Sequence, residues 1–113
     1  MYHYRAELAR VVDGDTAIFN IDLGMGNWVH GISMRLSGIN APEPHTETRD
    51  AGDAATKALA ILLDNDWDGT IRTHRDRRGK FGRYLVELPK KGGGTINDDL
   101  VKNGFAVSYM RGE

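Results

Sequence analysis

Three short segments carry the side chains with the most specific chemistry in this sequence. They are Asp-Gly-Asp-Thr at residues 13–16, Arg-Leu-Ser-Gly-Ile-Asn-Ala-Pro-Glu at 35–43, and Lys-Phe-Gly-Arg at 80–83. Together they supply oxygen ligands for a hard cation, a carboxylate that can act as a base, and two guanidinium groups that match phosphate oxygens. This set of groups is suited to cutting a phosphodiester bond.

The length and composition of the chain indicate one domain, residues 1–113, with one core. It has 113 residues, of which 40% are hydrophobic, enough for a single core and too few for a second. The longest apolar run, 58–63, is far shorter than the roughly 20 residues that span a bilayer, so we expect no membrane association. The N-terminal residues show no signal peptide, and we expect a cytoplasmic protein, of a kind that a phage or plasmid could encode.

The residue types present limit how a metal could be bound and how nucleic acid could be attracted. Cysteine is absent, which excludes thiolate chemistry and leaves oxygen atoms or the four histidines as ligands. The formal net charge of −1 gives no overall attraction to nucleic acid. Six basic residues and one acidic residue lie between Arg72 and Arg83, which predicts a local positive strip. Such a strip is also typical of a solvated hairpin rim, and both interpretations stay open.

Alternating apolar and polar residues predict three half-buried strands in the first 37 residues. The alternation covers residues 4–9, 19–23 and 32–37. Glycines and an asparagine at 24–27 suit a tight turn, so the second and third strands should form a hairpin. Since side chains alternate between the two faces of a strand, Arg35 should point away from the buried face.

The second half of the chain predicts two helices and two further strands. Apolar residues at helical spacing follow Asp50 and end at 64–66, and Thr95 or Asn97 can cap a short helix that stops at Gly104. Strands are expected at 69–74 and 83–88. Five strands with a helix inserted after the third predict an α+β, mainly β fold, a five-stranded OB-type barrel.

The order and spacing of five motifs resemble the staphylococcal nuclease (thermonuclease) family over nearly the whole chain. The motifs lie at residues 11–16, 35–43, 52–55, 80–85 and 97–106. Each one alone is typical of an ordinary turn, loop or strand, and their ordered combination carries the resemblance. The resemblance implies an OB-fold barrel with about three helices and a calcium-dependent nuclease that hydrolyses DNA and RNA.

The resemblance also implies a role for each residue at the matching motif positions. Asp15, Asn40 and the backbone carbonyl of Ala41 would bind Ca²⁺, which accepts such oxygen ligands together with water. Glu43 would position or deprotonate the attacking water. Arg35 and Arg83 would bind the scissile phosphate. Lys80, Phe81 and Tyr109 would contact the nucleic acid, DNA, RNA or both; for Tyr109 a packing role is an equally open interpretation.

Two departures from the family pattern affect these expectations. Asn40 stands where active members usually carry an aspartate, and an amide in place of a carboxylate should weaken calcium binding about ten-fold or more. The loop at 44–51 is shorter and the hairpin at 24–31 longer than the family pattern, so substrate preference cannot be transferred.

Two alternative functions compete with a monomeric nuclease. A catalytically silent OB module could bind nucleic acid through the positive strip after losing the metal site at Asn40. The presence of Glu43, Arg35 and Arg83 favours the enzyme, because a binding module has little use for a base and a phosphate clamp. An oligosaccharide-binding OB domain is ranked last, since the sequence lacks exposed aromatic pairs on which sugars stack.

Overall fold

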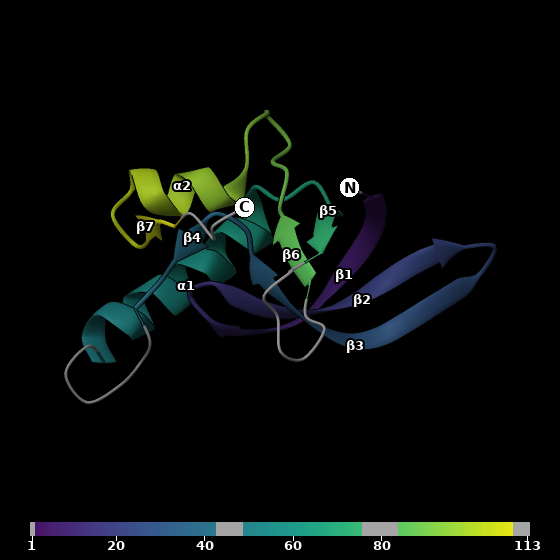
Figure 1. Cartoon of the computed structure of the whole chain (residues 1–113), viewed down its shortest axis with the longest axis horizontal. Coiled ribbons are helices and arrows are strands. Elements are labelled where there is room, and N and C mark those ends of the chain that lie inside the picture. Colours follow the sequence, from purple (N-terminus) through teal and green to yellow (C-terminus); the bar gives the residue numbers. More distant parts are fainter. Residues whose placement is uncertain (1, 43–48, 76–83, 110–113) are drawn as a thin grey trace.

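The computed structural model describes residues 2–42, 49–75 and 84–109 (Figure 1). Seven strands and two helices occur in these ranges. In chain order they are β1 (Tyr2–Asp13), β2 (Thr16–Gly24), β3 (Asn27–Leu36), β4 (Ile39–Asn40), α1 (Arg49–Asn65), β5 (Thr70–Arg75), β6 (Tyr84–Glu87), α2 (Ile96–Lys102) and β7 (Val107–Ser108).

Five of the strands close into a barrel. Its strand order is β1-β2-β3-β6-β5, with β5 pairing back onto β1. The β3–β6 pair is parallel and the other four pairs are antiparallel. The predicted five-stranded barrel is therefore confirmed, but the described ranges contain two helices rather than about three. The sequence also gave no sign of the second, two-stranded sheet formed by β4 and β7.

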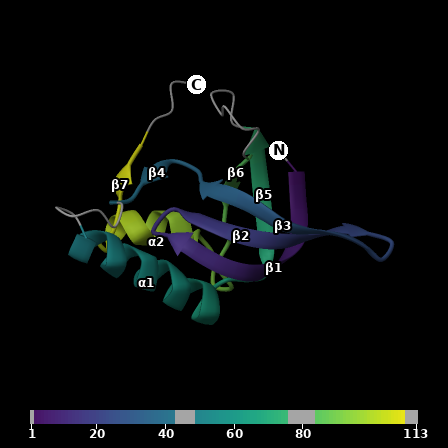
Figure 2. The ribbon, with the colours of Figure 1, turned by 90° about the horizontal axis from the view of Figure 1, so that it is seen from below.

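Side chains of the barrel strands and of both helices form one hydrophobic core. The two helices lie against the barrel (Figures 1 and 2). The largest fully buried side chains of the core are Phe19, Leu36, Leu59, Ile71, Leu88, Ile96, Leu100 and Val86. Each such side chain contributes about 1.5–3 kcal/mol through burial. Trp67 closes one edge of the core: its ring centroid lies 5.5 Å from that of Phe19, and its Nε1 donates to the Thr70 carbonyl at 2.7 Å.

The helix α1 forms where the apolar spacing predicts it and packs against β1. Its buried residues are Gly52, Ala55, Leu59 and Leu63, which recur every three or four positions and so lie on one face. Small residues begin this face and leucines end it, so the N-terminal half of α1 can approach the barrel closely. No helix in the described ranges is long and apolar enough to cross a membrane.

The helix α2 is fixed at both ends by its own sequence. The Thr95 hydroxyl accepts a hydrogen bond from the Asp98 amide at 3.1 Å, so Thr95 is the cap and Asn97 is not. After the helix, Gly104 adopts a φ of 82°, which a residue with a Cβ rarely does. The chain then turns back, and β7 pairs with β4.

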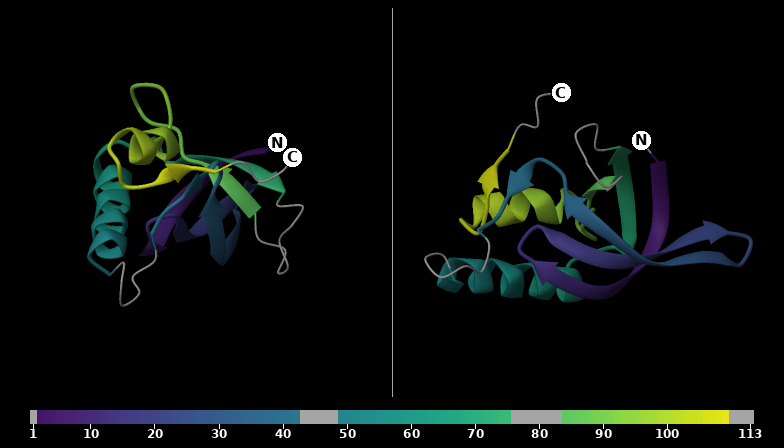
Figure 3. Two further views of the ribbon diagram at one scale, coloured as in Figure 1. Left: turned by 60° about the vertical axis from the view of Figure 1, so that its left-hand side comes forward. Right: turned by 60° about the horizontal axis from the view of Figure 1, so that its bottom comes forward.

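The hairpin of β2 and β3 projects from the barrel on the side away from the helices (Figures 2 and 3). Gly24, Met25 and Gly26 all have positive φ at its tip, as the predicted turn requires. Beyond the barrel the strands have no core to cover, and Leu23 is 53% exposed. Leu8 was also expected to be buried, but it is exposed. It lies next to a register shift in the pairing of β1 with β2, between Leu8 and Arg10, where the strand changes direction.

Candidate active site

Asp15, Arg35, Asn40 and Ala41 come together at one end of the barrel. Asp15 lies in the tight turn between β1 and β2, and the next residue, Thr16, pairs with Arg35 on β3. The amide of Leu36 donates to the Asp15 carbonyl at 2.8 Å, which fixes the turn against β3. Arg35 lies on the opposite face from the buried Met34 and Leu36, as predicted from strand alternation.

The carboxylate of Asp15 is buried, and both of its oxygens have partners. The residue is only 4% exposed. Oδ1 accepts from the Thr16 hydroxyl at 3.1 Å, and Oδ2 accepts from the Ala41 amide at 2.9 Å. A carboxylate that has left water needs hydrogen bonds and a cation to stay charged. Asp15 has the hydrogen bonds, and Arg35 supplies the cation.

One guanidinium nitrogen joins the two predicted side-chain ligands. Nη2 of Arg35 lies 3.3 Å from Oδ2 of Asp15 and donates to Oδ1 of Asn40 at 2.8 Å. The Nε of Arg35 is buried and has no hydrogen-bond partner within the described part of the chain. The oxygens of Asp15 and Asn40 therefore converge on a single cationic atom.

The positions of these two oxygens bear on whether the site suits a divalent cation. Two oxygens that already meet at one positive nitrogen can meet at a metal ion, and carboxylate and amide oxygens are both ligands for calcium. The described residues contain no group of three or more His, Asp or Glu side chains placed to hold a metal. A cation at this place would therefore have two side-chain oxygens, from Asp15 and Asn40, and would need its remaining ligands from the backbone or from water.

Asp13 is a second carboxylate beside the site whose role the sequence did not reveal. Its Oδ1 accepts from the Asp15 amide at 3.2 Å. Partial burial raises the pKa of Asp13, and the side-chain interaction with Asp15 and the negative charge of Asp15 raise it further, while the hydrogen bond from the Asp15 amide partly offsets this rise in pKa. The Asp-Gly-Asp motif could have indicated this interaction, since two residues that flank the first position of a tight turn can contact each other.

Gly14 lets this turn pack closely against its neighbours. A Cβ atom at position 14 would lie 2.5 Å from the Cβ of Ala55 on α1 and 2.8 Å from the Cβ of Ala41. Both distances are shorter than any normal carbon contact. Glycine at 14 and alanine at 41 and 55 together allow α1 to hold the turn in place, which fixes the position of Asp15.

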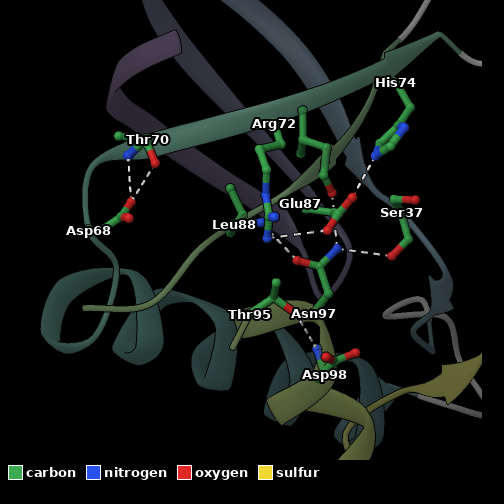
Figure 4. A network of polar contacts seen from close by, with 11 residues as sticks. Ser37, Asp68, Thr70, Arg72, His74, Glu87, Leu88, Thr95, Asn97 and Asp98 are labelled. Carbon is green, nitrogen blue, oxygen red and sulfur yellow. Dashed lines mark hydrogen bonds and ion pairs between the residues drawn. The ribbon is translucent and has the colours of Figure 1, made fainter. Parts of the chain in front are cut away.

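Asn97 holds the segment that leads to Asn40 (Figure 4). This buried side chain donates to the Ser37 and Val86 carbonyls, both at 2.9 Å, and accepts from the Leu88 amide at 3.0 Å. It therefore joins α2 to β6 and to the end of β3. The sequence indicated Asn97 as a possible cap and as the first residue of the motif at 97–106, but not this bridging role, although its place between the buried Ile96 and Leu100 was a signal for it.

The two-stranded sheet supports the same segment from the other side. Ile39 pairs with Ser108 and Asn40 pairs with Val107, and the Tyr109 amide donates to the Gly38 carbonyl at 2.8 Å. Tyr109 is 41% exposed and has further interactions besides this bond. Its predicted contact with nucleic acid stays a prediction.

The predicted positive strip is partly neutralised where the structure describes it. Nη2 of Arg72 lies 3.4 Å from Oε1 of Glu87, and Nε2 of His74 contacts Oε2 of the same carboxylate (Figure 4). Leu85 on β6 is paired with both His74 and Arg35. Arg72, His74 and Glu87 therefore lie on strands β5 and β6, next to the strand that carries Arg35. The positive charge of Arg72 is offset by the carboxylate of Glu87.

Four predicted site residues lie outside the described ranges. They are Glu43, Lys80, Phe81 and Arg83. Their roles as base, substrate contacts and second phosphate ligand stay predictions from the sequence.

Comparison with known proteins adds to this geometry. Residues 33–113 match the family model described as "Staphylococcal nuclease homologue". The chain is 30% identical over 116 residues to "Endonuclease YhcR" of Bacillus subtilis (strain 168). That match covers 95% of the chain but 9% of the relative, so the chain spans a small part of that protein's length. Because the family match extends over more than half of its residues, this chain belongs to the staphylococcal nuclease family.

Proposed function

We propose that this chain is a calcium-dependent nuclease that hydrolyses phosphodiester bonds in DNA, RNA or both. The observation that carries the proposal is the convergence of Asp15 Oδ2 and Asn40 Oδ1 on one cationic nitrogen, with Arg35 itself at the same place. Family membership and the name of the endonuclease relative support a nucleic-acid substrate.

Asp15, Asn40 and the carbonyl of Ala41 are the groups that would hold Ca²⁺. When bound, calcium would polarise a phosphate oxygen and offset the negative charge that develops during cleavage. Because Asn40 contributes no charge, we expect a higher calcium requirement than a site with two carboxylate ligands would have. The nearby Asp13 adds negative charge to the surroundings without being one of the proposed ligands.

The remaining chemistry is assigned to side chains of the chain itself. Glu43 acts as the base that takes a proton from the attacking water. Arg35 and Arg83 bind the phosphate, since a planar guanidinium stays charged and matches two phosphate oxygens at once. Lys80, Phe81 and Tyr109 contact the nucleic acid.

Cleavage of single-stranded DNA with calcium or with a chelator tests this proposal. The wild type should cleave with calcium and not with the chelator. Glu43→Gln should reduce turnover about 100-fold or more, which is the usual contribution of a general base. Glu7→Gln, at an exposed position on β1, is the matched control and should cleave like the wild type. Equal cleavage by the Glu43 variant would remove Glu43 from the mechanism.

A silent binding module is the second candidate, and one observation favours it. Asn40 provides an amide where active members usually carry an aspartate, and the described site has one buried carboxylate, Asp15. The same assay distinguishes the two functions. Retention of single-stranded DNA without cleavage at any calcium concentration would support the binding module.

A further inference from the structure

We infer that Arg35 competes with the divalent cation for the same oxygens, so that metal binding releases the guanidinium for the phosphate. This inference concerns regulation of the proposed site and rests on the proposed function. Arg35 is expected to bind a phosphate of the substrate. In this structure, however, it contacts Asp15 and Asn40 of its own chain.

The contacts of Arg35 coincide with those expected of the metal. Its Nη2 lies 3.3 Å from Asp15 Oδ2 and 2.8 Å from Asn40 Oδ1. A cation held by both oxygens would draw on the lone pairs that now face Nη2. Two positive groups that face the same lone pairs repel each other, so binding of one weakens binding of the other.

Burial makes the exchange energetically significant. Asp15 is only 4% exposed and the Arg35 side chain only 16%, so water screens their attraction poorly. For a metal ion to bind, the ion pair of Arg35 with Asp15 and its hydrogen bond to Asn40 both have to give way. The metal therefore has to replace a cation that the chain itself supplies.

The neutral side chain of Asn40 suits both occupants. Its amide oxygen accepts from Arg35 and can also coordinate calcium, and neither interaction adds a second negative charge. Arg35 and the metal thus compete mainly for the single charge of Asp15. Once displaced, Arg35 carries an unpaired positive charge at the edge of the site, which favours binding of a phosphate group.

Calcium titration by calorimetry, without substrate, measures this competition directly. Arg35→Met removes the competing cation and keeps most of the apolar stem, so calcium should bind about ten-fold more tightly than to the wild type. Arg35→Gln, which keeps a polar side chain, should also bind calcium more tightly than the wild type. This variant replaces Arg35→Met in the titration if Arg35→Met does not fold. Arg72→Met removes an arginine paired with Glu87 outside the site and should leave calcium affinity unchanged within about two-fold.

Two further measurements separate exchange from simple repulsion between positive charges. Arg35→Lys keeps the charge but loses the guanidinium contacts, so exchange predicts tighter calcium binding in this variant as well. Calcium should also shift the arginine side-chain nitrogen resonances of Arg35 in the wild type. Wild-type affinity in Arg35→Lys, or resonances that do not respond to bound calcium, would overturn the inference.

The outcomes also distinguish this inference from the proposed function. Calcium-dependent cleavage by the wild type, with equal calcium affinity in the wild type and both neutral Arg35 variants, would refute the exchange and leave the nuclease intact. Absence of calcium binding in every variant would refute both. Tighter binding in the Arg35 variants without any cleavage by the wild type would support the exchange and refute the nuclease.

Discussion

Gly14 and Ala55 are in such close contact that no side chain fits between them. A Cβ on Gly14 would lie 2.5 Å from the Cβ of Ala55. One residue comes from the turn before β2 and the other from α1, which lie far apart in the sequence. Because Asp15 follows Gly14 directly, this contact between a turn and a helix determines where the buried carboxylate of the site lies.

Gly14→Ala should therefore damage both the fold and the site. The added methyl group must push α1 or the turn away, and such overpacking costs about 1–3 kcal/mol of unfolding free energy. Urea unfolding measures the loss. Gly92→Ala is the matched control, since a Cβ there meets nothing within 4 Å. Equal stability of the two variants would contradict the proposed close contact.

Asn40→Asp should increase calcium affinity by about ten-fold. The new carboxylate also attracts Arg35, but a divalent cation gains about twice as much from the added charge as a guanidinium does. Calorimetric titration of calcium gives the affinity. Asn65→Asp adds the same charge at the exposed end of α1 and should have little effect. Unchanged affinity in the Asn40 variant would remove this side chain from the ligand set.

Asp13→Asn should stabilise the protein, measured with a chelator present, except in acid. The pKa of Asp13 is raised from 3.8, mainly by burial, so the folded state holds this proton more tightly than the unfolded state. The contribution of Asp13 to the unfolding free energy should therefore fall as the pH rises above 3.8.

The asparagine variant lacks this ionisation and should be more stable than the wild type at pH 7, with the difference vanishing below the unfolded-state pKa. Denaturant unfolding at a series of pH values tests the sign. Asp64→Asn, at an exposed position on α1, should give a smaller difference between neutral and acid pH. A wild type that is the more stable protein at pH 7 would contradict the prediction.

Asn97→Ala should destabilise the protein by about 2–4 kcal/mol. It leaves the buried Leu88 amide and Val86 carbonyl, and also the Ser37 carbonyl, without their side-chain partner. Calcium affinity should fall as well, because Ser37 begins the segment that carries Asn40. Asn65→Ala, a change at an exposed position, should stay within about 0.5 kcal/mol of the wild type. A loss below about 1 kcal/mol would show that Asn97 is not needed to hold this segment.

Local sequence features predicted much of the fold because local physics decides those elements. The alternation around Met34, the helical spacing around Leu59 and the cap at Thr95 each concern residues within a few positions of one another. The turn at Gly24 and Gly26 needs positive φ, and glycine is the residue that allows it most readily. These elements formed as expected.

Long-range contacts could not be predicted in the same way. The β7 strand has only two residues, too few to show any periodicity, and it forms because β4 lies beside it. Asn97 reaches Ser37 from 60 positions away in the sequence. The contact between Arg35 and Asn40 depends on the exact placement of both segments. Motif order indicated that Asp15, Arg35 and Asn40 meet, but not that Arg35 would contact both of the other two side chains.

The pairing of β4 with β7 means that the site depends on the order in which the chain is synthesised. Asn40 is translated well before Val107 and Ser108, which pair with its short strand. A nascent chain that has not reached Ser108 lacks this half of the framework around Asn40. The support that β7 gives to Asn40 can therefore form only after translation has passed Ser108.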